Sequence, residues 1–190
     1  DNVAESNFNR QLHAIDGNIG KPKVTAMRER VQAINPFCQV LEIDDFITAD
    51  NVGQLLDFSF DIVLDCIDDA KAKVALAVYC KQTKIPLMMS GGAGGRLDPS
   101  VEGDKLVAKV RNILRRDFAF PKGSNTLKKS AKFGISCVYS NEPVMQPRDN
   151  ACAIDSSVTG LNCAGYGSAV SVTAGFGMLL AQRALNHLLK

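Results

Sequence analysis

Hydrophobic positions along the chain recur at two spacings, which indicates alternating helices and strands. Apolar residues three or four apart, as in 24–34, are typical of one face of a helix, whereas a short apolar run such as 61–66 is typical of a buried parallel strand. The pattern predicts helices at 22–35, 50–56, 69–83, 103–118 and 167–189, and strands at 39–43, 61–66, 85–90 and 134–140. This alternation predicts an α/β fold with a mostly parallel sheet flanked by helices.

Polar residues follow the predicted strand 61–66, where ligands bind in open parallel sheets. Asp69 is placed to cap the next helix, as Asp50 is for the helix 50–56. Asp68 then remains for a ligand, because a carboxylate can hold Mg²⁺ or a ribose hydroxyl; the alternative is that Asp68 is the cap. The glycine run 91–95 after the next strand would let the backbone approach a ligand or another chain closely.

Two basic residues near the N-terminus are candidate phosphate ligands. Arg10 presents a planar fork of donors that matches phosphate oxygens. Lys23 lies at a helix start, where the helix N-terminus also favours anions. The alternative for both is a solvated surface side chain.

Composition describes an ordinary globular chain. With 190 residues, 46% hydrophobic and 22% charged, it is long enough for one domain, 1–190, and is neither disordered, collagen-like nor a coiled coil. The net charge of +2 conceals a basic block at 105–132, with nine basic residues and one acidic residue, on a remainder of −6. The block suggests a nucleic-acid partner, and a solvated helix face with a flexible loop is the alternative.

The six cysteines include no C-x-x-C pair, so no zinc site is expected, and a reduced cytoplasmic compartment is the simplest interpretation. Cys163 lies in a glycine-rich turn before a helix, where its thiolate would be stabilised; a small packed residue is the alternative. The uncharged stretch 156–181 contains polar residues and five glycines, which favours a buried helix over a membrane span. Stable membrane insertion is not expected, and association with a membrane surface stays open.

Taken in order and at their spacings, these motifs resemble the ubiquitin-activating-enzyme-like (ThiF/MoeB/HesA) superfamily. Its pattern is an acidic strand end, then S-N-x-x-R-Q, G-x-x-K and D-x-x-D. The matching residues here are Asp1, Ser6–Gln11, Gly20–Lys23 and Asp65–Asp68, and Ile34–Pro36 matches its I-N-P. Other stretches resemble the branch that dehydrates threonylcarbamoyladenosine in tRNA, namely 9–14, 90–99, 114–118, 134–140 and 162–167.

The resemblance implies a Rossmann-like fold and an ATP-dependent enzyme. Asn7, Arg10 and Lys23 would contact the ATP phosphates, and Asp68 would bind Mg²⁺ or position the nucleotide. The threonyl carboxylate of threonylcarbamoyladenosine, beside the tRNA anticodon, would be adenylated, and its carbamoyl group would then close a ring with loss of AMP. Cys163 would be at most an acyl or sulfur acceptor. The residues expected to grip tRNA are Arg111, Arg115, Arg116, Lys128 and Lys129.

The resemblance also implies features beyond the printed chain. The family's glycine-rich nucleotide loop precedes the acidic strand end, so the first βαβ unit is expected to be missing and ATP binding by these 190 residues alone to be weak. Residues are also expected to be absent near Ser100–Gly103. A homodimer and sulfur-transfer partner proteins are further expectations. The alternatives are adenylation of the C-terminus of a ubiquitin-like or sulfur-carrier protein, a non-catalytic scaffold, and an NAD-dependent oxidoreductase, for which G-x-G-x-x-G is lacking.

Overall fold

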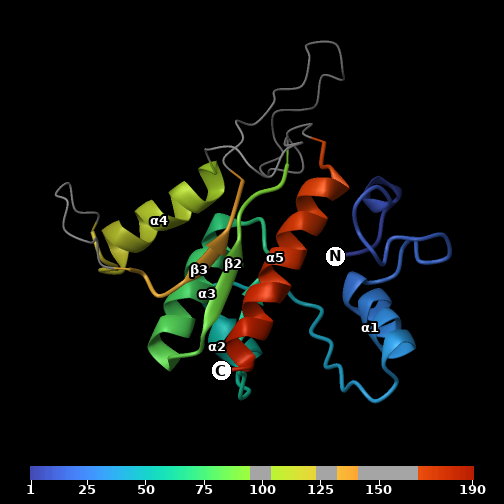
Figure 1. Cartoon of the computed structure of the whole chain (residues 1–190), viewed down its shortest axis with the longest axis horizontal. Coiled ribbons are helices and arrows are strands. Elements are labelled where there is room, and N and C mark those ends of the chain that lie inside the picture. Colours follow the sequence, from blue (N-terminus) through green and yellow to red (C-terminus); the bar gives the residue numbers. More distant parts are fainter. Residues whose placement is uncertain (95–103, 123–131, 141–166) are drawn as a thin grey trace, which may run out of the picture. The chain divides into compact units, whose positions relative to one another are not determined.

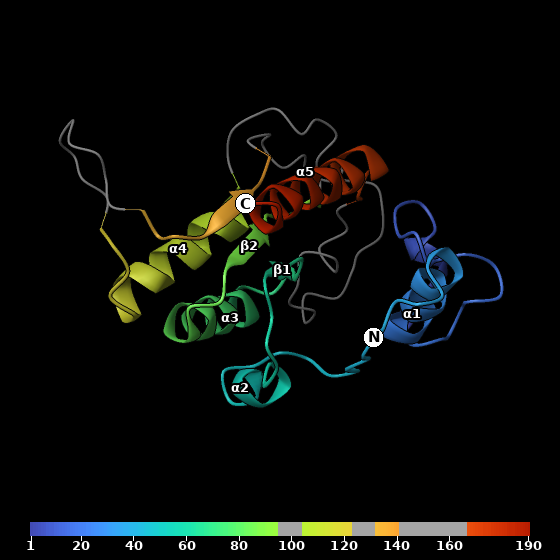
Figure 2. The ribbon, with the colours of Figure 1, turned by 60° about the horizontal axis from the view of Figure 1, so that its bottom comes forward.

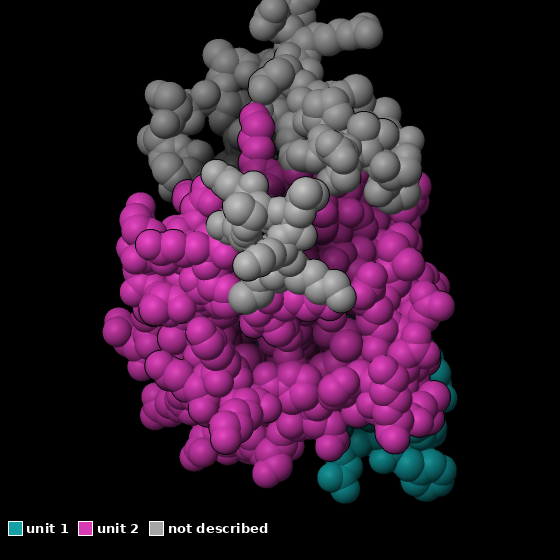
Figure 3. Space-filling model, turned by 60° about the vertical axis from the view of Figure 1, so that its left-hand side comes forward, with its two compact units in different colours: residues 1–46 teal, residues 47–190 magenta. Residues whose placement is uncertain are grey.

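The computed structural model describes residues 1–94, 104–122, 132–140 and 167–190, which divide into two compact units, Asp1–Phe46 and Ile47–Lys190 (Figure 3). The prediction of a single domain stays a prediction, and each unit is described by itself. In chain order the elements are the 3₁₀ helix η1 (Glu5–Asn7), α1 (Lys23–Ile34), α2 (Val52–Leu55), β1 (Val63–Asp65), α3 (Ala70–Thr83), β2 (Leu87–Ser90), α4 (Lys105–Asp117), β3 (Ser136–Val138) and α5 (Val170–Leu188).

In the N-terminal unit, the segment that precedes α1 is hydrogen-bonded to the start of that helix. The Val3 amide donates to the Lys21 carbonyl at 2.9 Å, and the Lys23 amide donates to the Asp1 carbonyl at 2.8 Å. Val3, Ala14 and Ala26 form the small buried core of this unit. These contacts place the start of the chain beside the first turn of the helix.

The strand predicted at 39–43 is wrong. Among the described residues, this segment pairs with no strand, and its Glu42 is held by side chains of α1. Glu42 accepts a hydrogen bond from the Thr25 hydroxyl at 2.5 Å and pairs with Arg28. A strand needs a paired neighbour, and here an ionic contact with a helix takes its place.

The C-terminal unit contains a parallel sheet in the order β1-β2-β3; Figure 1 shows β2 beside β3, and Figure 2 shows β1 beside β2. Leu64 is opposite Met88, and Met88 is opposite Ser136. The predicted α/β fold with a parallel sheet is confirmed.

Helices cover both faces of the sheet. Successive residues of a strand point to opposite faces, so a buried strand such as β2 contributes apolar side chains to the core on each side. Leu87 and Met89 of β2 pack in the core formed with α3 and α4. Met88, between them, packs against α5, which buries the stripe Val172, Phe176, Leu180 and Ala184. Figure 2 shows α5 on one side of the strands and α3 and α4 on the other.

The helix boundaries lie within three residues of the predicted ones, the largest difference being the start of α5 at Val170 instead of 167, and one predicted cap is wrong. The helix predicted at 50–56 begins at Val52, and its N-cap is Asn51 instead of Asp50. The Asn51 side chain accepts from the Thr48 amide at 2.7 Å, which fixes the turn ahead of the helix one residue later than expected. In the part of the chain that the structure describes, no helix combines the length and apolarity that a membrane crossing requires.

Candidate active site

The carboxyl end of β1 is organised by two aspartates with different partners. Asp65 is buried, and its Oδ1 accepts from the Ile67 amide at 2.9 Å, which fixes the turn after the strand. Asp69 accepts from the Ala72 amide at 2.8 Å, which confirms it as the N-cap of α3. Asp68 lies on this turn with an exposed side chain, at the edge of the sheet where the sequence places a ligand.

A buried ion pair lies directly beneath this edge. Lys73 Nζ is 3.1 Å from Asp65 Oδ1 and donates to the Ser90 carbonyl at 2.8 Å. Both side chains are essentially inaccessible, at 0% exposure for Lys73 and 1% for Asp65. Lys73 therefore joins α3 to the carboxyl ends of β1 and β2.

Sequence reasoning missed Lys73, although a signal was present. It shares a helix face with Ala70, Ala77 and Cys80, all of which are buried. A lysine on such a face requires a buried partner, because an unpaired charge in the interior is costly. The aspartate that ends the preceding strand was the available partner.

Burial has the largest effect on the pKa of Asp65. Desolvation raises the pKa of its carboxyl above the ordinary value, and the opposing effect of Lys73 is smaller. Its second oxygen, Oδ2, is buried without a hydrogen-bond partner among the described residues. The pair thus places two buried, poorly solvated charges under the strand ends.

The glycine turn that follows β2 packs against the residue before α4 and against the end of β3. The Gly92 amide donates to Asp104 Oδ2 at 2.9 Å, and the Gly91 amide donates to the Val138 carbonyl at 2.7 Å. A Cβ on Gly91 would overlap Asp104 Oδ2 and lie 2.8 Å from Tyr139 Cβ. The close approach expected from the glycine run is therefore made, at Gly91, by other parts of this chain.

The N-terminal unit holds the three predicted phosphate ligands. Asn7 is buried and its Oδ1 accepts from the Ala4 amide at 3.1 Å. Arg10 is half-buried, and its Nη1 donates to the Ser6 carbonyl and to Asn9 Oδ1, each at 2.9 Å. Lys23 Nζ is 2.5 Å from Asp1 Oδ2. Each side chain is thus held in place by its own unit.

A second polar pair in this unit was not singled out from the sequence. Gln11 Oε1 and both ring nitrogens of His13 are buried, and none has a hydrogen-bond partner among the described residues. Burial, and then the charge of Lys23, lowers the pKa of His13, which favours the neutral ring. In its neutral form the His13 ring has one hydrogen-bond donor and one acceptor.

The basic residues of α4 divide by their contacts. Arg111 is exposed, whereas Arg115 donates to the Pro121 carbonyl at 3.1 Å and lies 5.3 Å from the Phe133 ring centroid. Arg116 is exposed and paired through two nitrogens with Asp117, at 2.6 and 2.8 Å. Arg115 thus has a structural role at the end of α4. Lys128 and Lys129 lie outside the described residues.

Two cysteines of the described residues are in surroundings that favour the protonated thiol. Burial raises the pKa of Cys80 and of Cys137 to about 11. Cys163 and the segment Ser100–Gly103 lie outside the described residues. Within the described ranges, no three His, Cys, Asp or Glu side chains gather as a metal cluster would require.

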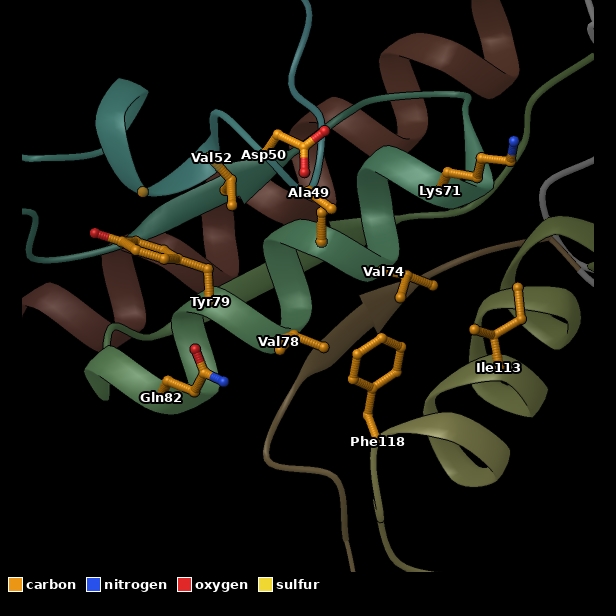
Figure 4. Close-up of a pocket in the computed structure, with 12 residues that line it drawn as sticks. Ala49, Asp50, Val52, Lys71, Val74, Val78, Tyr79, Gln82, Ile113 and Phe118 are labelled. Atoms are coloured by element: carbon orange, nitrogen blue, oxygen red, sulfur yellow. The ribbon is translucent and has the colours of Figure 1, made fainter.

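A groove of about 670 Å³ runs along the outer face of α3 (Figure 4). Val74 and Val78 of α3 and Phe118 at the end of α4 point into it. Its lining shares no residue with the strand-end site described above. The groove is therefore a feature separate from the carboxyl edge of the sheet.

Comparison with known proteins agrees with this arrangement. The model of the ThiF family matches residues 1–190, and the chain belongs to that family. It is 39% identical to the tRNA threonylcarbamoyladenosine dehydratase of Escherichia coli (strain K12), over 100% of this chain and 74% of that protein.

Solved structures of the E. coli protein, named TcdA, extend the likeness to three dimensions. Its complex with AMP has a TM-score of 0.82, and its complex with ATP has a TM-score of 0.81. Both are 37% identical and cover all of this chain, and 73% and 72% of the respective solved chains. The resemblance predicted from the ordered motifs is confirmed.

Proposed function

We propose that this protein catalyses the ATP-dependent dehydration of threonylcarbamoyladenosine in tRNA. The observation that carries the proposal is that the match to tRNA threonylcarbamoyladenosine dehydratase spans the whole chain in sequence and in structure. ATP and AMP bound to that relative fit a reaction that splits ATP at its α-phosphate.

In the first step, a threonyl carboxylate oxygen attacks the α-phosphate of ATP, and pyrophosphate leaves. Negative charge builds on the phosphate oxygens during this attack, and cationic side chains offset it. Arg10 and Lys23 supply that charge, and Asn7 holds the turn from which Arg10 extends. Adenylation converts the carboxylate oxygen, a poor leaving group, into part of AMP.

In the second step, the carbamoyl group of the same nucleoside attacks the activated carbonyl. The ring closes, AMP departs with the former carboxylate oxygen, and one proton is released. The balance over both steps is the loss of one water from the nucleoside. Because both reacting groups belong to the substrate, the protein's contribution is to position them, and Cys163 is not required.

Asp68 is suited to hold Mg²⁺ together with ATP. Its carboxylate is exposed at the carboxyl end of β1, and Mg²⁺ is usually bound by one or two carboxylates plus substrate phosphates. When bound, the ion would supply positive charge to the phosphates.

The exposed basic side chains of α4 support tRNA binding by this helix. Lys105, Lys109 and Arg111 are exposed along it, and phosphate contacts of this kind give affinity without reading sequence. Charge reversal at Lys109 and Arg111 should weaken tRNA binding and flatten its salt dependence. Binding that is unchanged in affinity and salt dependence would remove α4 from the tRNA surface.

We also propose that the protein forms a homodimer through α5. This helix exposes Met178 (75%) and Leu185 (58%) on the face away from its buried stripe. Light scattering of the intact protein should give twice the monomer mass, and Met178→Glu should lower it; monomer mass for the wild type would contradict the proposal. Sulfur-transfer proteins remain proposed partners, testable by co-purification.

The test of the function is mass spectrometry of nucleosides from tRNA incubated with the intact protein and ATP. The expected product is 18 Da lighter than threonylcarbamoyladenosine, with AMP formed in equal amount, and Arg10→Ala and Asp68→Ala should abolish both. AMP formed only when a ubiquitin-like or sulfur-carrier protein is supplied would favour carrier adenylation instead.

A further inference from the structure

Lys73 is a buried charge that contacts the ends of two neighbouring strands. It projects from the first turns of α3 and is fully inaccessible to solvent. Its ammonium contacts Asp65 Oδ1 at 3.1 Å and the Ser90 carbonyl at 2.8 Å. One residue thus links the ends of β1 and β2.

Both linked ends lead directly into the candidate site. Beyond Asp65, the turn held by the Ile67 amide carries Asp68. Beyond Ser90, the chain enters the glycine turn, where the Gly92 amide is held by Asp104. A displacement of either strand end would therefore move groups at the carboxyl edge of the sheet.

We propose that Lys73 is a positioning residue for adenylation, which holds Asp65 and the Ser90 carbonyl together and so fixes the Asp68 turn relative to the glycine turn. This inference rests on the proposed function. Because Lys73 is fully inaccessible, it acts through Asp65 and Ser90.

The choice of variant decides whether the proposal can be tested. Lys73→Met alone leaves the Asp65 carboxylate buried and unpaired, which threatens folding. The double variant Asp65→Asn/Lys73→Met removes both charges, and Asn still accepts from the Ile67 amide. It keeps a neutral core while breaking the link between the strand ends. Lys71→Met, an exposed residue of the same helix, is the matched control.

Two measurements on the intact protein separate positioning from stability. For the double variant, we expect kcat for AMP formation to fall roughly 100-fold, because misplacement of about 1 Å can have that effect. The KM for ATP should stay near the wild-type value, since Arg10 and Lys23 are untouched. Lys73→Arg, which keeps the charge, should retain about tenfold more of the wild-type kcat than the double variant.

The second measurement is hydrogen exchange of the peptides that contain Ile67 and Gly92. Deuterium uptake in both should rise in the double variant and stay at the wild-type level in Lys71→Met. A folded double variant with wild-type kcat or unchanged uptake would overturn the proposal and leave the function standing. If the wild type forms neither AMP nor the dehydrated nucleoside, the function fails and the catalytic part of this proposal fails with it. The exchange data would then still decide whether Lys73 holds the strand ends.

Discussion

Replacing Asp104 should destabilise the protein more than replacing the equivalent cap of the neighbouring helix. Asp104 is buried, and it divides its two oxygens between the Val107 amide at 2.8 Å and the Gly92 amide at 2.9 Å. Loss of the helix cap costs about 1 kcal/mol. Leaving the Gly92 amide without its acceptor costs a further ~1–3 kcal/mol. Asp104→Ala should therefore lower the free energy of unfolding by about 2–4 kcal/mol.

Asp69 provides the matched control. It caps α3 through the Ala72 amide at 2.8 Å, with its side chain exposed, so Asp69→Ala should cost only about 1 kcal/mol. Asp104→Asn isolates one contact, because its NH2 group replaces one of the two oxygens that accept from the backbone amides. Urea unfolding followed by circular dichroism gives each value from the midpoint and the slope. Equal destabilisation by Asp104→Ala and Asp69→Ala would refute the reasoning that Asp104 joins α4 to the glycine turn.

Three further predictions follow from single contacts. Gly91→Ala should destabilise by about 1–3 kcal/mol in urea unfolding because of overpacking against Asp104, whereas Gly175→Ala, with open space in α5, should be neutral or stabilising. Cys80 and Cys137, whose pKa is raised from 9.0 to about 11, keep protons that the unfolded chain releases. Their contribution to stability is complete below pH 9 and is lost as pH rises through about 11. The free energy of unfolding should therefore change less between pH 8 and pH 10.5 in Cys80→Ala/Cys137→Ala than in the wild type. Arg111→Glu should reduce the slope of tRNA affinity against salt, whereas Arg115→Gln should mainly lower the melting temperature, because Arg115 holds Pro121; the reverse pattern would contradict these roles.

Most helices and the parallel strands could be predicted because their signals are local. The cap at Asp69 and the apolar runs before Cys66 and Ser90 require no knowledge of distant contacts. The strand at 39–43 could not be judged in the same way, because an extended segment becomes a strand only if a neighbour pairs with it. Here Glu42 is drawn to Thr25 and Arg28 instead.

The sequence names candidate site residues where a motif contains them, and it does not name residues whose role depends on burial. Arg10, Lys23 and Asp68 follow from ordered motifs. Lys73 has no motif, and its importance depends on contacts with Asp65 and Ser90 that only folding brings together. Charge counting likewise could not separate Arg111 from Arg115, since both lie on the same basic helix and only the structure shows that Arg115 is held by Pro121.

Isotope transfer tests the central claim, adenylation of the threonyl carboxylate, most directly. Substrate tRNA would carry ¹⁸O in both oxygens of that carboxylate, and the intact protein would convert it with unlabelled ATP. The account predicts one ¹⁸O atom in each AMP released and one retained in the dehydrated nucleoside. Label recovered in inorganic phosphate with ADP as product, or unlabelled AMP, would contradict it.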